Sequence, residues 1–86
     1  MQLRQTDTFE RDAKRLDASV KSRLKSAIEK ILRQPTIEKP LRHYPNFFSE
    51  RVGHFRLIYR LETPDSILLY CFKNRDEVYD ELQRLL

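Results

Sequence analysis

The chain has few of the residues that mark disulfide-bonded, membrane-spanning or flexible proteins. Its 86 residues include one cysteine, one glycine and no tryptophan. A single cysteine cannot form an internal disulfide bond, so nothing points to an oxidising compartment. No apolar run approaches the ~20 residues of a membrane-spanning helix, and the charged N-terminus lacks the apolar stretch of a signal peptide. We therefore expect a cytoplasmic protein that does not engage a membrane.

The length predicts a single domain over residues 1–86 with one modest hydrophobic core. Cys71 lies in an apolar run, where a small core residue is expected rather than a nucleophile. There is no glycine-rich phosphate loop and no metal-ligand spacing. The two histidines, His43 and His54, have no carboxylate in a matching position. We expect neither a metal nor a cofactor.

Charge is distributed unevenly along the chain. The formal net charge is +4. The last thirteen residues carry two basic and four acidic side chains, whereas the first seventy-three carry fifteen basic and nine acidic ones. A basic body with an acidic tail suits a polyanion such as nucleic acid, or an acidic protein partner. An ordinary solvated surface would also explain it.

The N-terminal half has the spacing of two helices. Asp7 and Glu10 have the form of a capping box, and Asp17 offers a cap for a second helix. Apolar residues then recur at helical spacing up to Pro35, which stops the helix. The pattern predicts a helical hairpin whose apolar stripe must pack on another element.

The C-terminal half changes to the period of strands. Residues 1–4 form a candidate edge strand, 48–52 and 55–61 form two strands joined at Gly53, and 67–73 form a third. This last strand is apolar on both faces, which predicts a central position. Val78, Leu82 and Leu85 return to helical spacing. The order β-α-α-β-β-β-α predicts an α+β fold, with a helical hairpin packed on a small, mostly antiparallel sheet and a C-terminal helix.

Strand alternation gathers basic residues on one face of this sheet. His54, Arg56 and Arg60 alternate with apolar residues that would take the helices. Arg51 stands across the turn, and Lys73 and Arg75 follow the third strand. Several guanidinium groups on one sheet face suit phosphate oxygens, because they are always charged and bind in a forked geometry. The alternative is a face kept soluble by charges that pair with Glu50 and Glu62.

Tyr79 lies at the start of the expected C-terminal helix, near several cations. Its ring suits stacking on a base and its hydroxyl suits proton transfer. A tyrosine beside Val78 is also a common packing residue.

Two stretches resemble a known family. Residues 47–59, FFSERVGHFRLIY, followed by residues 70–79, YCFKNRDEVY, are similar to the RelE/ParE toxin superfamily, as is the N-terminal FERDAKRL. The resemblance covers nearly the whole chain. It implies two antiparallel helices on a small curved sheet, in agreement with the pattern of the residues.

The resemblance also implies an activity. RelE-type members cleave mRNA on the ribosome without a metal, through attack of a 2′-hydroxyl on the neighbouring phosphate. By this resemblance Arg56, Arg75 and Tyr79 are the catalytic candidates, with Arg56 at the scissile phosphate. Arg51, His54, Arg60 and Lys73 are the candidates for RNA binding.

The chain departs from the pattern of the active ribonucleases before the turn. Phe47 and Ser49 stand where those enzymes place further basic residues, so the general base is missing. His54 is a substitute candidate, since imidazole exchanges protons near neutral pH. Two alternatives remain, a ParE-like inhibitor of DNA gyrase that acts by binding, and a weakly active or non-toxic member that mainly binds its antitoxin.

The ribonuclease interpretation and both alternatives to it imply a cognate antitoxin. The resemblance predicts a small acidic protein that wraps the helical hairpin and covers the basic face. For the ribonuclease interpretation, mRNA on the ribosome is the further partner.

Overall fold

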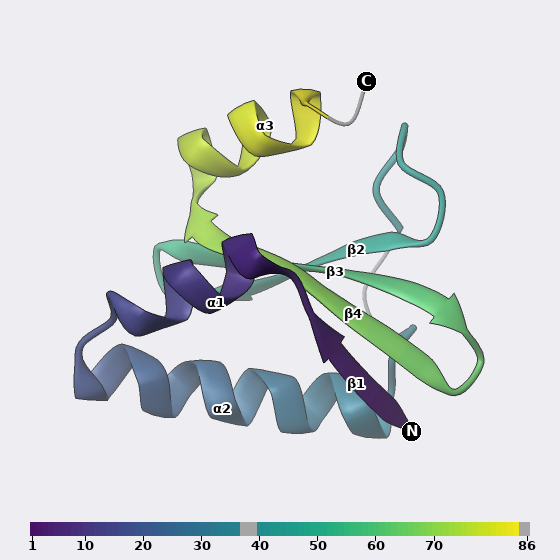
Figure 1. Cartoon of the computed structure of the whole chain (residues 1–86), viewed down its shortest axis with the longest axis horizontal. Helices are drawn as coiled ribbons and strands as arrows, with labels where there is room; N and C mark the ends of the chain where they lie inside the picture. The colour runs from purple at the N-terminus through teal and green to yellow at the C-terminus, as the bar shows by residue number, and fades with distance from the viewer. Residues whose placement is uncertain (37–39, 85–86) are drawn as a thin grey trace.

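The computed structural model describes residues 1–36 and 40–84, which form a sheet with helices on both sides (Figure 1). The elements follow the predicted order: β1 (Gln2–Gln5), α1 (Asp7–Lys14), α2 (Ala18–Arg33), β2 (Phe47–Val52), β3 (Phe55–Thr63), β4 (Ser66–Asn74) and α3 (Arg75–Gln83). The strand order across the sheet is β1-β4-β3-β2. The α+β prediction is confirmed, and so is the central position of the third predicted strand, which is β4. Leu85, part of the predicted last helix, lies outside the described residues.

The two N-terminal helices begin at well-defined caps. Asp17 caps α2, as predicted, and its side chain accepts the backbone N–H of Val20 at 2.9 Å. For α1 the capping-box prediction is wrong by one residue. The cap is Thr6, whose hydroxyl oxygen accepts the N–H of Phe9 at 3.0 Å. The same hydroxyl donates to the carbonyl of Tyr70 at 2.6 Å, a contact with β4 that selects Thr6 over Asp7.

One edge of β4 is paired with β1 over part of its length and is contacted by α1 beyond it. β1 runs parallel to β4 and pairs with it only along residues 66–69. Beyond that point Asp12 takes over, because its Oδ2 accepts the backbone N–H of Phe72 at 3.0 Å and its Oδ1 accepts from Lys73 Nζ at 2.7 Å. A carboxylate thus satisfies a backbone donor that would otherwise be unpaired. This contact joins the helical hairpin to the strand that leads into α3.

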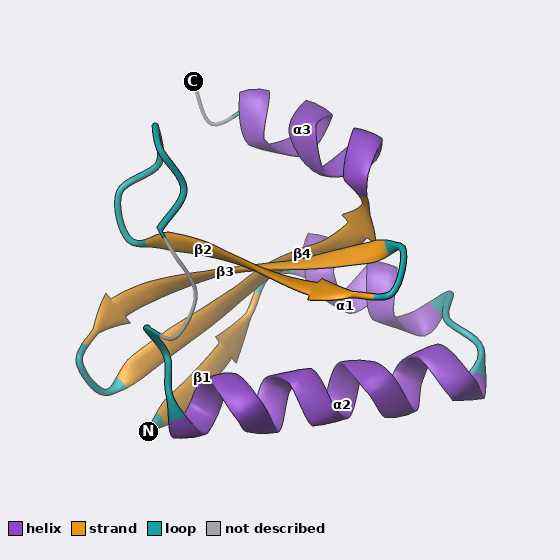
Figure 2. Cartoon of the chain, turned by 180° about the vertical axis from the view of Figure 1, so that it is seen from behind, coloured by secondary structure: helices purple, strands orange, loops and turns teal. Residues whose placement is uncertain are grey.

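Each face of the sheet carries its own apolar cluster. α1 and α2 cover one face and α3 lies over the other, as the view from behind also shows (Figure 2). The larger cluster joins the hairpin to the sheet through Phe9, Leu24, Ala27, Ile31, Phe48, Val52, Leu57, Tyr59, Ile67, Leu69 and Phe72. The smaller one lies under α3 and consists of Phe47, Ile58, Cys71, Val78 and Leu82. The face expected to be basic is therefore partly apolar and partly covered, because Val78 and Leu82 bury their side chains against it.

The turn between β2 and β3 contains two residues, Gly53 and His54. Val52 pairs with Phe55, which leaves only these two in the loop. Gly53 has φ +61°, a conformation that glycine adopts without the steric cost of a Cβ. His54 was expected on β3 beside Arg56, and that expectation is wrong: β3 begins at Phe55.

Candidate nucleic-acid interface

On the α3 side of the sheet, β2 and β3 present three cross-strand pairs of side chains. The antiparallel register places directly opposite each other Arg51 and Arg56, Ser49 and Ile58, and Phe47 and Arg60. Residues directly opposite in an antiparallel pair share one face. The sequence prediction that Arg56 and Arg60 share a face is therefore confirmed, and Arg51 joins them.

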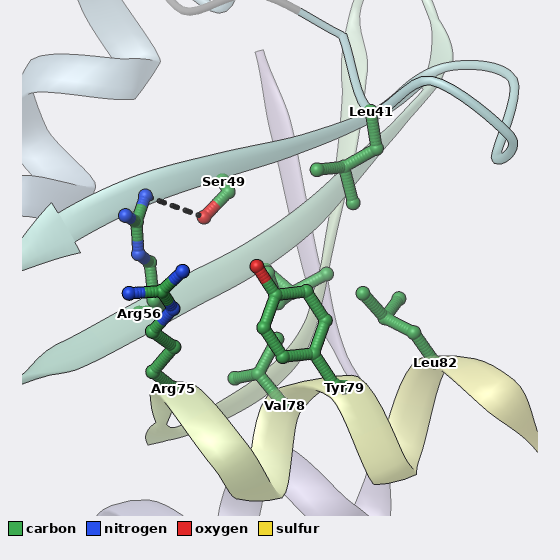
Figure 3. A pocket seen from close by; sticks show the side chains of 8 residues that line it. Leu41, Ser49, Arg56, Arg75, Val78, Tyr79 and Leu82 are labelled. Carbon is green, nitrogen blue, oxygen red and sulfur yellow. Dashed lines mark hydrogen bonds between the residues drawn. The ribbon is translucent and has the colours of Figure 1, made fainter.

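Arg56 and α3 take part in a hollow between the strands and this helix. Leu41, Ser49, Arg56, Ile58, Arg75, Val78, Tyr79 and Leu82 line it. Arg56 donates from Nη1 to Ser49 Oγ at 3.4 Å. Tyr79 extends from α3 with its hydroxyl toward the strands, while Arg75 projects beside Arg56 (Figure 3). The fold thus brings together the three residues predicted to be catalytic, although nineteen residues separate Arg56 from Arg75.

A second hollow adjoins the first, beside the turn between β2 and β3. Its lining includes Arg51, His54, Arg56 and Arg75. Arg56 and Arg75 line both hollows, so the two form one continuous basic surface. His54 reaches this surface from the turn rather than from the strand, and it is exposed.

In the part of the chain that the structure describes, no carboxylate pairs with the arginines of this surface. Within residues 1–36 and 40–84, none of Arg51, Arg56 and Arg75 has a carboxylate within ion-pair distance. The two acidic residues that would have paired with them in the alternative interpretation lie elsewhere: Glu50 accepts from Lys30 at 2.8 Å and Glu62 from Arg4 at 3.1 Å. Other exposed basic residues, such as Arg11 and Arg23, also lack a carboxylate partner among the described residues, so this surface is distinguished by the gathering of Arg51, Arg56 and Arg75 at two adjoining hollows.

Two of the residues predicted to bind RNA lie outside the hollows. Lys73 forms its ion pair with Asp12, and the two side chains are only 18% and 7% exposed. Arg60 lies opposite Phe47, the pair farthest from the turn, and its guanidinium carbon is 5.6 Å from the centre of the Phe47 ring. Their roles in RNA binding stay predictions.

The structure adds lining residues that the sequence did not single out. Leu41 comes from the connector before β2 and has no pattern that marks it. Val78 and Leu82 were recognised as the apolar stripe of the last helix, but the face they cover was not. Ser49 was noted only as a departure from the family pattern, and it is a hydrogen-bond partner of Arg56.

Burial under α3 suppresses ionisation of two neighbouring groups. It raises the pKa of the Cys71 thiol from 9.0 to about 12, and the nearby carboxylates of Asp12 and Glu81 act in the same direction. Burial and the charge of Glu81 also raise the pKa of Tyr70. A buried thiol that stays protonated is a core residue and not a nucleophile, in agreement with the sequence.

The described part of the chain lacks both a metal-binding cluster and a membrane-spanning helix. No group of three or more His, Cys, Asp or Glu residues lies close enough to hold a metal ion. Among the same residues, no helix is long and apolar enough to cross a membrane.

Solved structures share this fold along most of their length. The isolated RelE toxin of E. coli superimposes with a TM-score of 0.77 at 24% identity, covering 99% of this chain and 98% of that one. A RelBE toxin–antitoxin complex from Mycobacterium tuberculosis gives 0.73 at 28% identity, over 86% and 96%. The YoeB/ParE toxin from Agrobacterium tumefaciens gives 0.77 at 20% identity, over 87% and 99%. The fold is that of the RelE-type toxins.

The family follows from the sequence as a whole. The family model described as the ParE toxin of type II toxin–antitoxin systems matches residues 3–79. No match was found among the curated proteins. The chain belongs to the ParE toxin family and is a toxin of a type II toxin–antitoxin system.

Proposed function

We propose that this toxin is an endoribonuclease that cleaves mRNA on the ribosome and so arrests translation. The observation that carries the proposal is the convergence of Arg56, Arg75 and Tyr79 on one hollow, where no carboxylate of the described residues pairs with either arginine. Guanidinium groups fixed near a phosphate stabilise the charge that develops on its oxygens during cleavage. An inhibitor that acted by binding alone would not need this arrangement.

The reaction is a transfer within the RNA backbone. The 2′-oxygen of one nucleotide attacks the adjacent phosphorus, the bond from phosphorus to the 5′-oxygen breaks, and the products are a cyclic phosphate and a 5′-hydroxyl. Arg56 and Arg75 would hold the two non-bridging oxygens. One proton leaves the 2′-hydroxyl and one arrives at the departing 5′-oxygen.

Two side chains are in a position to handle those protons. Tyr79 is 54% exposed and its hydroxyl points toward the strands beside Arg56 (Figure 3). His54 lines the adjoining hollow together with Arg56 and Arg75. We assign proton acceptance to His54 and proton donation or base stacking to Tyr79. Phe47 and Ser49 offer no alternative base, since the phenylalanine side chain is a hydrocarbon and the serine hydroxyl is a very weak base.

Phe47 and Ser49 favour a second candidate function. With no base at position 47 or 49, the chain fits a toxin that acts on DNA gyrase by binding and without chemistry. In that case the basic surface would contact a protein or DNA and Tyr79 would serve only as a contact.

The partner of the toxin follows from its family. We propose a cognate antitoxin, small and acidic, that wraps the helical hairpin and covers the basic face. Structures similar to this chain include toxins solved together with antitoxins from E. coli and Methanococcus jannaschii. Opposite charge across such an interface would speed association and favour the correct partner.

Induction of the toxin without an antitoxin tests the proposal. We expect growth arrest, a stop in the incorporation of labelled amino acids and broken messages. Arg56→Ala, Tyr79→Ala and His54→Ala should each relieve the arrest. Tyr79→Phe, which keeps the ring, should relieve it if the hydroxyl donates the proton and not if the ring only stacks on a base. Arg11→Ala, at an exposed position of α1 on the opposite side of the sheet, serves as the control. Arrest with intact messages and broken DNA would reject cleavage and support action on gyrase. No arrest, with a folded product, would indicate a member that mainly binds its antitoxin.

A further inference from the structure

Arg60 lies at the far end of the same sheet face, over an aromatic ring that the fold holds in place. Its guanidinium carbon is 5.6 Å from the centre of the Phe47 ring, which is 8% exposed. Tyr70 meets that ring edge-to-face at 5.3 Å and Tyr44 does so at 6.4 Å. Three aromatic rings therefore fix the surface on which the guanidinium rests.

The outer side of Arg60 is available to a ligand. The residue is exposed, and no carboxylate of the described segments lies within ion-pair distance of it. A planar cation that rests on one ring and faces water on its other side can accept a second flat group. Nucleobases stack on arginine planes in this way.

The position of Arg60 suits the same strand of RNA that would reach Arg56. The two residues are four apart on β3 and share a face, so their backbones lie ~13 Å apart. A stacked strand rises about 3.4 Å for each nucleotide, so the separation corresponds to about four nucleotides, and to fewer in an extended strand. An RNA bound at the arginine hollow and running along β3 would meet Arg60 within that length.

We propose that Arg60, held over Phe47, is a second nucleotide-binding position, at which an unpaired base of the RNA stacks on the guanidinium. The proposal rests on the proposed function, since it places the substrate strand along the face that carries Arg56. Phe47 then has a use of its own: it departs from the family's basic pattern and becomes the support of the stacking residue. The position reads the flat face of a base, so it accepts any base and holds purines more tightly than pyrimidines.

The test measures binding of RNA that cannot be cleaved. The probes are 2′-O-methylated oligoadenylates of two and six nucleotides, with a six-nucleotide oligouridylate for comparison. We expect Arg60→Ala to weaken the adenylate hexamer about tenfold or more, the range reported when a stacking side chain is removed. The dinucleotide, which is too short to reach from Arg56 to Arg60, should lose almost nothing. The uridylate should lose less than the adenylate.

The lysine variant separates stacking from charge. Arg60→Lys keeps the charge and removes the plane, so it should weaken the hexamer nearly as much as Arg60→Ala does. Arg11→Ala and Arg11→Lys are the matched controls on the opposite side of the sheet. Full rescue by lysine, or an equal loss for both probe lengths, would overturn the stacking site.

Other outcomes separate this inference from the proposed function. If Arg56→Ala abolishes message cleavage while Arg60→Ala leaves hexamer binding unchanged, the second position is wrong and the function stands. If the unaltered protein does not bind the hexamer, the inference is also overturned, and message cleavage in cells still decides the function. A loss of antitoxin affinity in Arg60→Ala without any loss of RNA binding would assign Arg60 to the protein partner instead.

Discussion

Lys73 Nζ lies 2.7 Å from Asp12 Oδ1, so the end of the central strand is tied to the helical hairpin just before α3 begins. The other oxygen of the same carboxylate accepts the N–H of Phe72. Because Arg75 follows Lys73 by two residues, this contact also helps to set where α3 starts. It explains why Lys73, basic and well placed in the sequence, does not join the arginines of the two hollows.

The Asp12–Lys73 contact should contribute measurably to stability. Asp12→Ala leaves a largely buried ammonium and a backbone N–H without their partner, which typically costs about 3 kcal/mol. We expect a loss of that size in the free energy of unfolding, measured by denaturant titration. Glu10→Ala removes the exposed ion pair with Lys14 on the same helix and should cost less than about 0.5 kcal/mol. Equal losses for the two variants would show that the buried contact has no special weight.

Arg56 should matter for activity and little for folding. Its side chain is half-buried and makes one long hydrogen bond to Ser49, so Arg56→Ala should leave the free energy of unfolding within about 1 kcal/mol of the parent. If Arg56 stabilises the transition state, message cleavage should slow by about 10²–10³. The rate of appearance of cleaved ends on ribosome-bound message is the measurement. Cleavage at the parental rate by folded Arg56→Ala would remove this residue from the catalytic group.

Gly53 should resist substitution because of its backbone conformation. At φ +61° a side chain with a Cβ is strained, and the added Cβ would also lie 3.3 Å from Arg23 Nη1, the movable end of a long side chain. We expect Gly53→Ala to cost about 1 kcal/mol. Gly53→Asn should cost less, because asparagine tolerates this region better. Thermal melts of the three proteins provide the comparison, and identical melting temperatures would contradict the strained turn.

The Cys71 thiol should be inert until the chain unfolds. Its pKa in the folded protein, about 12, lies above the ordinary 9.0, so folding opposes its ionisation. This contribution to stability is complete below pH 9 and is lost as the pH rises from 9 toward 12. At pH 8 we expect iodoacetamide to label the native protein far more slowly than the protein in denaturant. Rapid labelling of the native protein would mean that the core under α3 opens readily.

Much of the fold was predictable from the sequence because the signals are local. The helical spacing, the stop at Pro35 and the alternation along β3 each depend on residues within a few positions of one another. The failures are equally instructive. Thr6 and Asp7 are both good caps, and it is Thr6 that is bonded to β4, through its N–H to the Leu69 carbonyl and its hydroxyl to the Tyr70 carbonyl. His54 continued the alternation of β3, but the two-residue turn takes it out of the strand.

The candidate site was predictable only in part. Arg56, Arg75 and Tyr79 were named through the family resemblance, and the structure brings them to one hollow. The separation of Arg60 and Lys73 from that hollow could not be foreseen. It depends on Phe47 and on Asp12, which are thirteen and sixty-one residues away along the chain.

The sequence by itself determined the fold class of this protein, because hydrophobic periods of 3.6 and 2 predict helices and strands from neighbouring residues alone. It also placed Arg56 and Arg60 on one side of the sheet, because residues an even number of positions apart within a strand share a face. Only the tertiary structure decided which of the basic residues are free to meet a phosphate. A charge is neutralised by a partner close in space and not in sequence. The fold pairs Lys73 with Asp12, whereas among the described residues no carboxylate lies within ion-pair distance of Arg51, Arg56, Arg60 or Arg75.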